Sequence, residues 1–273
     1  MTVRFEPAAS DTVRDTVRDT VRDTRPYRAT RTATRMSVLE LLRRWPSMLF
    51  MIFMPASYFL VSYLTSDAVT VVPAKVYDGD AQTVAQVLDR DFKALYLAVL
   101  GISVTASFAA MTVVRPGMTA LRRLRLVGYR AHHLLSARLY VLLIITAVST
   151  AVFMVIFVPL VTLRSVALAG AALLLVGLVG VALGTLVGLL VPREFEASML
   201  LVAAAGVQMA LGRAGADAER FLPYWPGIEA LKSAAFVPGA DVTRFLGLGA
   251  LYALVLFGLS HIVWNRRTRL WRR

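Results

Sequence analysis

The feature that most constrains this chain is an apolar stretch, residues 139–191, in which 53 residues carry a single charge, Arg164. A helix needs about 20 apolar residues to cross about 30 Å of hydrocarbon. The stretch is therefore too long for one crossing and fits two, with a turn near residues 159–165. The whole chain is 58% apolar, above the roughly 45–50% that is typical of soluble domains. We expect a membrane protein that crosses the bilayer several times.

Four other apolar segments complete the set of predicted spans. Residues 45–64, 94–114 and 245–264 are each long enough to cross the hydrocarbon. Residues 197–212 form a shorter segment, about 24 Å long as a helix, which is less than a comfortable crossing. Together with the two crossings in residues 139–191, these segments predict an all-α membrane protein with six transmembrane helices.

The basic residues predict how these helices are oriented. Segments 25–44 and 115–138 each hold six Arg and residues 265–273 hold five, against one acidic residue in all three. Segments 65–93 and 213–244 have no such excess, with three basic residues against five acidic and four against four. Because positively charged loops stay on the cytoplasmic side, both termini and the 115–138 loop are predicted to be cytoplasmic. Both ends on one side require an even number of spans, which agrees with six.

The N-terminal region divides into two parts. Residues 1–34 are polar and repeat Thr-Val-Arg-Asp three times. This composition predicts a disordered low-complexity tail, with a charged helix as the alternative. Residues 35–273 are predicted to form the six-helix membrane domain. At its start, Met36 and Leu39 have helical spacing ahead of Trp45, which predicts a basic amphipathic helix in the membrane interface.

Residues suited to catalysis or metal binding are few. The chain has no Cys, and the adjacent His132 and His133 would point about 100° apart on a helix, which does not suit a shared metal ion. Lys232 and Ser233 follow Leu231 instead of Gly, so the chain has no P-loop for ATP. We therefore predict no catalytic, cofactor-binding or metal-binding residues.

The apolar spans also carry no Asp or Glu. Glu194 and Glu196 fall at a cytoplasmic boundary, and Glu229 falls in the outer region. Transporters driven by protons or sodium usually carry buried ionisable groups on the ion path. We therefore expect any transport by this chain to be powered by a separate ATPase on the cytoplasmic side.

The basic cytoplasmic loop contains a helical pattern. After the Pro116-Gly117 break, Leu121, Leu124 and Arg125 have the spacing of one helix face. The pattern predicts a short helix that docks into a partner's groove. A loop that only fixes the topology explains the charges equally well and the Leu spacing less well.

The end of the fifth apolar segment is interrupted. Pro223 and Pro226 break any continuous helix, and Tyr224 and Trp225 suit the membrane interface. These residues predict a re-entrant pair of half-crossing helices on the outer side, between spans five and six. The alternative is an ordinary external loop with an amphipathic helix.

Small residues recur in the fourth span. Gly180, Gly184 and Gly188 are spaced four apart, which lets helices approach closely. The pattern predicts packing within the helix bundle, with a dimer seam as the alternative.

Three stretches carry a resemblance to a known family: residues 36–44, 121–138 and 221–232. Their order around the spans makes residues 35–270 similar to ABC-2-type permeases, the membrane subunits of bacterial drug, lipid and polysaccharide exporters. The resemblance implies efflux of a hydrophobic or amphipathic compound across the bacterial cytoplasmic membrane. It also implies a partner ABC ATPase that holds the ATP and Mg, a second permease copy or sister permease, and no nucleic acid.

The resemblance further implies roles for individual residues. The residues that would couple to the ATPase are Met36, Leu39, Leu121, Arg122, Arg123, Leu124, Arg125 and Tyr129. The residues that would line the translocation path, on the first and fifth spans, are Phe50, Phe53, Met54, Tyr58, Met199, Gln208 and Met209. The residues that would form the re-entrant gate are Pro223, Tyr224, Trp225, Pro226 and Glu229.

Two other functions stay open at this point. A membrane enzyme acting on lipids would need paired catalytic groups, and the available Glu194, Glu196 and His pair form no evident constellation. A membrane anchor or immunity subunit would need no transport at all. The sequence does not specify the cargo, the direction of transport, or whether the permease pairs with itself.

Overall fold

The computed structural model describes residues 45–66, 70–78, 81–115, 131–214, 217–238 and 241–269. The predicted tail, the interfacial helix at 36–44 and the docking segment at 118–129 lie outside these residues. In chain order the elements are α2 (Trp45–Leu64), β1 (Val71–Asp78), β2 (Ala81–Leu88), α3 (Asp89–Val114), α5 (Ala131–Leu160), α6 (Val166–Leu190), α7 (Glu194–Ala214), η1 (Asp217–Phe221), α8 (Trp225–Phe236) and α9 (Thr243–Arg269).

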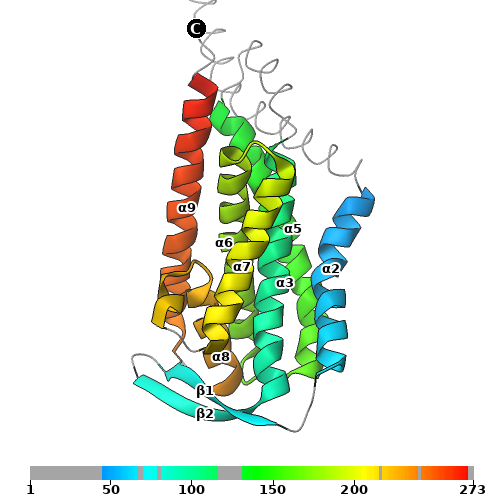
Figure 1. The fold of residues 1–273 in the computed structure, drawn as a ribbon, viewed down its shortest axis with the longest axis vertical. Helices are drawn as coiled ribbons and strands as arrows, with labels where there is room; N and C mark the ends of the chain where they lie inside the picture. The colour runs from blue at the N-terminus through cyan, green and yellow to red at the C-terminus, as the bar shows by residue number, and fades with distance from the viewer. Residues whose placement is uncertain are drawn as a thin grey trace, which may run out of the picture.

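Five helices of the described chain, α3, α5, α6, α7 and α9, are long and apolar enough to cross a membrane. They run side by side along the long axis of the molecule (Figure 1). This is the architecture of a helical protein that crosses a membrane several times, as the sequence predicted. The first predicted span, α2, has 20 residues, of which Ile52–Leu64 form a shorter apolar helix.

The fifth predicted span is longer than expected. The sequence placed it at residues 197–212, whereas α7 runs over 21 residues from Glu194 to Ala214. Its first turn contains Glu194 and Glu196, and carboxylates are favourable there because they face the positive end of the helix dipole. A hydropathy reading stops at these charges, although the helix itself continues through them.

The turn between α5 and α6 falls where the sequence predicted it. α5 ends at Leu160 and α6 begins at Val166, with Ser165 as the N-cap. The backbone amides of Arg164 and Ser165 donate to the carbonyls of Ala235 and Ala234, at 3.3 and 3.0 Å. The turn is therefore tied to α8, far away in the sequence.

α6 lies at the centre of the bundle and packs against α3, α5, α7, α8 and α9. The small residues of α6 face α3: a Cβ at Gly180 would lie 2.8 Å from the Ser103 carbonyl oxygen, and one at Gly184 would overlap the Ser107 carbonyl. Gly188 lies in the same way against Met111. The three glycines thus sit inside the bundle of a single chain and let the α3 and α6 backbones touch.

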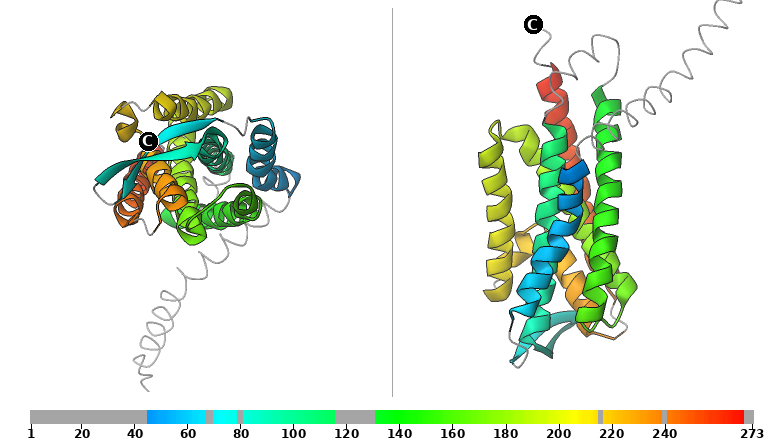
Figure 2. Two further views of the ribbon diagram at one scale, coloured as in Figure 1. Left: turned by 90° about the horizontal axis from the view of Figure 1, so that it is seen from below. Right: turned by 90° about the vertical axis from the view of Figure 1, so that its right-hand side faces the viewer.

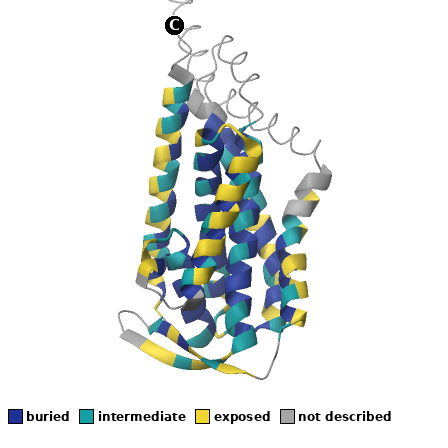
Figure 3. Cartoon of the chain, viewed as in Figure 1, coloured by how far each residue is buried: buried dark blue, intermediate teal, exposed yellow. Residues whose placement is uncertain are grey.

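Burial follows this arrangement. Figure 3 shows α3, α6 and α8 mostly buried, while α2, α7 and α9 carry exposed stripes. Large apolar side chains are among the exposed residues: Val155 on α5 is 76% exposed and Leu254 on α9 is 68% exposed. Large apolar side chains at such exposure are expected where lipid, not water, surrounds the protein.

The fold differs from the all-α expectation in one place. β1 and β2 form an antiparallel hairpin, with Val71 opposite Leu88 and Asp78 opposite Ala81. Along β1, Ala74 and Val76 are buried while Pro73 and Lys75 are exposed, the alternation of a half-buried strand. Seen from below in Figure 2, the hairpin lies across one end of the bundle, over α3 and α8.

Candidate functional site

The most unusual element is α8, a helix of 12 residues that is too short to cross a membrane. It packs against α6, α9, α3 and β1, and its residues from Pro226 to Ala235 are buried. Pro226 stands in its first turn, where a missing N–H costs no hydrogen bond. A helix therefore follows the proline break that the sequence indicated, and it begins at Trp225.

A buried ion pair lies on this helix. Lys232 Nζ is 2.6 Å from Glu229 Oε1, and the two side chains are only 6% and 3% exposed. Lys232 also donates to the Lys75 carbonyl on β1, at 3.3 Å. Glu229 Oε2 is buried without a hydrogen-bond partner among the described residues. Burial raises the pKa of Glu229, and the attraction of Lys232 opposes that rise.

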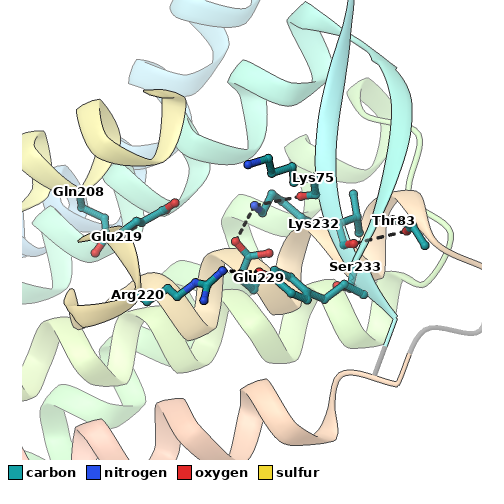
Figure 4. A network of polar contacts seen from close by, with 10 residues as sticks. Lys75, Thr83, Gln208, Glu219, Arg220, Glu229, Lys232 and Ser233 are labelled. Carbon is teal, nitrogen blue, oxygen red and sulfur yellow. Dashed lines mark hydrogen bonds and ion pairs between the residues drawn. The ribbon is translucent and has the colours of Figure 1, made fainter. Parts of the chain in front are cut away.

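α8 also holds the outer edge of the hairpin. Ser233 Oγ donates to the Tyr77 carbonyl at 2.7 Å, and Arg220 donates to the Tyr77 hydroxyl at 3.3 Å. The Ser233 and Lys232 contacts occupy the Tyr77 and Lys75 carbonyls, which a third strand could otherwise pair. Figure 4 shows the α8 side chains reaching the strand from one side. The hairpin and the short helix therefore form one polar unit.

A second buried carboxyl group lies beside this unit. Glu219 on η1 is 5% exposed, and its Oε1 accepts a hydrogen bond from Gln208 Nε2 on α7 at 3.3 Å. Burial raises the pKa of Glu219 to about 7, although Lys232 acts in the opposite direction. At neutral pH this carboxyl group therefore changes between its acidic and its ionised form.

Tyr224 connects the same end of the bundle to α3. Its hydroxyl lies 3.3 Å from Ser107 Oγ, which in turn donates to the Gly180 carbonyl on α6 at 2.9 Å. The Tyr224 side chain is 2% exposed, and burial raises its pKa to about 12. Tyr224 is therefore a neutral hydrogen-bonding group at the N-cap of α8.

A small cavity of about 10 Å³, enough for about one water molecule, lies between α3, α7 and α8. Its lining is Tyr96, Val99, Leu100, Ser103, Ala205, Gln208, Met209, Tyr224 and Ile228. Two of the polar atoms on these residues, Tyr96 Oη and Gln208 Oε1, are buried without a hydrogen-bond partner in the described structure. The cavity thus adjoins the Gln208–Glu219 contact and leaves two oxygen atoms unsatisfied.

The structure distributes the predicted path residues over different surroundings. Phe53, Tyr58 and Met199 are exposed, Met54 and Met209 are half-buried, and Gln208 is buried. Phe50 falls in α2. Within one chain, α2 packs against α3 and α5, whereas α7 packs against α3, α6 and η1. The helices that carry the two sets of predicted path residues, α2 and α7, therefore share α3 as a neighbour and otherwise pack against different elements.

The predicted gate residues gather at the hairpin end. Tyr224, Pro226 and Glu229 are buried, and Pro223 is half-buried. The half-buried Trp225 packs edge-on against Phe245 of α9, with ring centroids 5.6 Å apart. All predicted ATPase-coupling residues lie outside the described residues.

Sequence reasoning missed the partners of Glu229. Lys232 and Ser233 entered it only as a failed P-loop, and Tyr96 and Glu219 were not singled out. The available signal was the spacing of Glu229 and Lys232, three apart in the apolar run 226–236. Residues at this spacing face each other on a helix, and an apolar helix buries such a pair.

Arginine side chains hold the opposite end of the bundle. The contacts are Arg115 to the carbonyls of Val191 and Arg193, Arg138 to that of Val114, and Arg267 to that of Leu190. The carbonyls of Val114, Leu190 and Val191 lie at or just beyond a helix C-terminus, where backbone acceptors have no intrahelical partner. The Arg193 carbonyl precedes α7 and also accepts from the backbone amide of Ala197. Arg115 follows α3 and Arg138 lies in α5, so these contacts tie the end of α3 to α5 and to the α6–α7 turn.

Comparison of the sequence with known protein families and with curated proteins finds no match.

Proposed function

We propose that this chain is the membrane subunit of an ATP-driven exporter of the ABC-2 type, with six spans and both termini in the cytoplasm. It moves a hydrophobic or amphipathic compound across the bacterial cytoplasmic membrane. A separate ATPase supplies the energy, and a second permease subunit completes the translocation path. The chain itself carries out no catalysis.

The observation that carries this proposal is the buried half-length helix α8. Twelve residues extend about 18 Å as a helix, roughly half of a bilayer crossing. Irregular backbone at membrane depth is tolerated only where protein or a water-filled cavity covers it, and α3, α6, α9 and the hairpin cover α8. A re-entrant η1–α8 pair that closes a path from the outer side accounts for this arrangement. A membrane anchor that transports nothing does not require such a re-entrant pair.

The distribution of charge supports an external energy source. Among the described residues, Glu219, Glu229 and Lys232 gather beneath the hairpin, and Arg115 and Arg138 lie at the other end. The middle of the central helix α6 is purely apolar or small. Ion-driven transporters place ionisable groups near the bilayer midplane, so this pattern favours a partner that hydrolyses ATP.

The arginine end supports a docking site for that partner. Arg115, at the end of α3, and Arg138, on α5, hold these helices to the bundle on either side of segment 116–130, which contains the predicted docking helix. A partner docked on this segment would pass its movement to α3 and α5. The excess of Arg at this end supports a cytoplasmic position for it.

The test is to purify the tagged protein from its native membrane in mild detergent and identify the proteins that come with it. We expect a stoichiometric P-loop ATPase, lost when Leu121→Asp and Leu124→Asp are combined. Leu126→Asp is the matched control, because on a helix Leu126 faces away from Leu121 and Leu124, and this variant should retain the ATPase. A folded bundle that brings no ATPase would overturn the proposal in favour of a membrane enzyme or an anchor.

A further inference from the structure

The two strands of the hairpin have unequal outer edges. α8 covers the edge of β1, because its Lys232 and Ser233 donate to carbonyls of that strand. β2 makes its main contacts with β1 and α3, and Val84 and Gln86 on it are exposed. Figure 4 shows α8 on the β1 side of the hairpin, away from the far edge of β2. The outer edge of β2 is therefore open in the described part of a single chain.

The strand register shows which backbone groups lie on this open edge. Asp89 donates its amide to the Thr70 carbonyl at 2.7 Å. Along an antiparallel ladder, pairs bonded in this way alternate with pairs whose N–H and C=O groups point outward. The backbone groups of Gln82, Val84 and Gln86 therefore point away from β1. The same alternation turns outward the β1 carbonyls that α8 binds, as is observed.

β2 lacks the features that normally keep an open edge from pairing with another strand. Such edges usually carry charged residues or proline, whereas residues 81–88 contain neither. β1, whose edge is covered, has both Pro73 and Lys75. Val84, at the middle of the open edge, is 63% exposed. The protective residues thus lie on the covered strand, and β2 is suited to receive a further strand.

The hairpin is oriented for pairing within the plane of a membrane. It lies across one end of the bundle (Figure 2), with Ala74 and Val76 buried on one face and Lys75 and Val84 exposed on the other. The faces of the sheet therefore point along the bundle axis, and its edges point sideways. Two copies in one membrane share an orientation, so a two-fold axis that relates them runs in the same direction. Such an axis reverses a strand that lies in the plane, and it brings two β2 strands together antiparallel.

We propose that the outer edge of β2 pairs with β2 of a second copy of this chain, antiparallel and centred on Val84. In this register Val84 faces its counterpart and Gln82 faces Gln86, so all of these outward backbone groups are paired. Because β2 carries no charge, the pairing avoids the repulsion of like charges placed opposite each other. The two hairpins then form one sheet that spans both bundles. In naming this copy as the second permease subunit, the inference rests on the proposed function.

Single cysteines test the pairing without background, because the chain contains no Cys. The full chain is reconstituted in lipid vesicles and oxidised. Val84→Cys should form a disulfide between copies, since residues in a hydrogen-bonded pair have Cα atoms about 5.5 Å apart, within disulfide range. Lys75→Cys is the matched control, because Lys75 lies opposite Val84 in the hairpin and is exposed on the same face. Its counterpart would be three strand spacings away, about 14 Å, so this variant should not cross-link.

Proline variants measure how much the pairing contributes to association. Val84→Pro removes an outward N–H from each copy and leaves the bonds within the hairpin in place. It should weaken association by about tenfold or more, measured by energy transfer between labelled chains as added lipid dilutes them. Val71→Pro is the matched control, because Val71 is an exposed valine whose N–H points outward on β1. This variant should associate as the unaltered chain does.

The outcomes identify what covers the edge and separate the two proposals. In the native membrane, Val84→p-benzoylphenylalanine captures whatever lies on β2: capture of the same chain supports the pairing, and capture of a different protein overturns it. Equal cross-linking by Val84→Cys and Lys75→Cys, or unweakened association of Val84→Pro, also overturns it. Pairing that persists while co-purification brings no ATPase removes the proposed function and leaves the pairing standing, so the two failures are distinguishable.

Discussion

Lys232 Nζ lies 2.6 Å from Glu229 Oε1, one helical turn apart on a helix whose surroundings exclude water. An ion pair at this depth contributes little net stability, because both charges lose their hydration. Removal of only one of the two charges is more damaging, because the other charge is then buried without a partner. The pair therefore makes the position of α8 sensitive to single substitutions.

Lys232→Met should lower the free energy of unfolding by about 3–5 kcal/mol, because Glu229 then stays buried without its cation. The double variant Glu229→Met with Lys232→Met should be more stable than this single variant, since no uncompensated charge remains. Unfolding of both in mixed micelles, followed by circular dichroism, gives the comparison. If the double variant is the less stable of the two, the pair stabilises the fold by itself and our account of it is wrong.

The pH dependence of stability should follow Glu219. Its pKa is raised from 4.5 to about 7 in the folded chain, so the fold favours the protonated form. The stability from this group is therefore fully present below about pH 4.5 and is lost as the pH rises through about 7. The raised pKa of Glu229 acts in the same direction.

The measurement is the unfolding midpoint between about pH 5 and pH 8 for three chains. Glu219→Gln should show a much weaker decline with rising pH than the unaltered chain. Glu194→Gln, at an exposed position, should keep the full decline. An unchanged slope in Glu219→Gln would assign the effect to another group.

Arg115 should determine how firmly the α6–α7 turn is held. Its guanidinium donates to the carbonyls of Val191 and Arg193. Arg115→Gln removes contacts worth about 1 kcal/mol or more, which corresponds to about fivefold to tenfold faster local opening. Hydrogen exchange measured by mass spectrometry over residues 191–196 reports this change. Arg266→Gln, an exposed arginine on α9, is the control and should leave exchange in the turn unaltered.

The long helices were predictable from the sequence for a simple physical reason. In lipid every backbone N–H and C=O must be paired within the protein, so a long apolar run has few alternatives to a helix. The turn near residues 159–165 was predicted correctly on this basis. The break near Pro223 was predicted from the prolines themselves, although Pro226 lies in the first turn of α8. Helix ends were less certain: Asp89 and Asp91 in the first turn of α3 lie inside a helix that hydropathy begins at residue 94.

The hairpin was not predicted, because its stability does not reside in its own sequence. Two isolated strands are marginal, and β1 depends on Lys232 and Ser233 of α8 for the carbonyls of Lys75 and Tyr77. The local signal was present in the alternation along Ala74, Lys75 and Val76. It was obscured because the charges of this segment were read only as a guide to membrane topology.

Because charges were interpreted only as a guide to membrane topology, part of the candidate site was also not predicted. Glu219, Glu229 and Lys232 were counted as charges of a balanced outer loop, and loop charges are normally solvated. The structure buries all three. Burial of a charge depends on what packs over it, here β1 and α3 from other parts of the chain. A sequence pattern has no access to that information.

Gly184→Ala should be the most damaging of the small changes on α6. The added methyl group would overlap the backbone carbonyl of Ser107, which cannot move aside as a side chain can. Overpacking of this kind costs about 1–3 kcal/mol, and it should also weaken the bond from Ser107 to the Gly180 carbonyl. Gly188→Ala, whose methyl group would lie 3.2 Å from Met111 Cα, should cost less. Gly247→Ala on α9 meets open space and should be neutral or gain up to about 1 kcal/mol from helix propensity. Unfolding of the three variants in micelles gives the order, and cross-linking between chains gives the control. If Gly184→Ala leaves the unfolding free energy unchanged but prevents cross-linking, the glycines form a contact between two chains, and our account of packing within one chain is wrong.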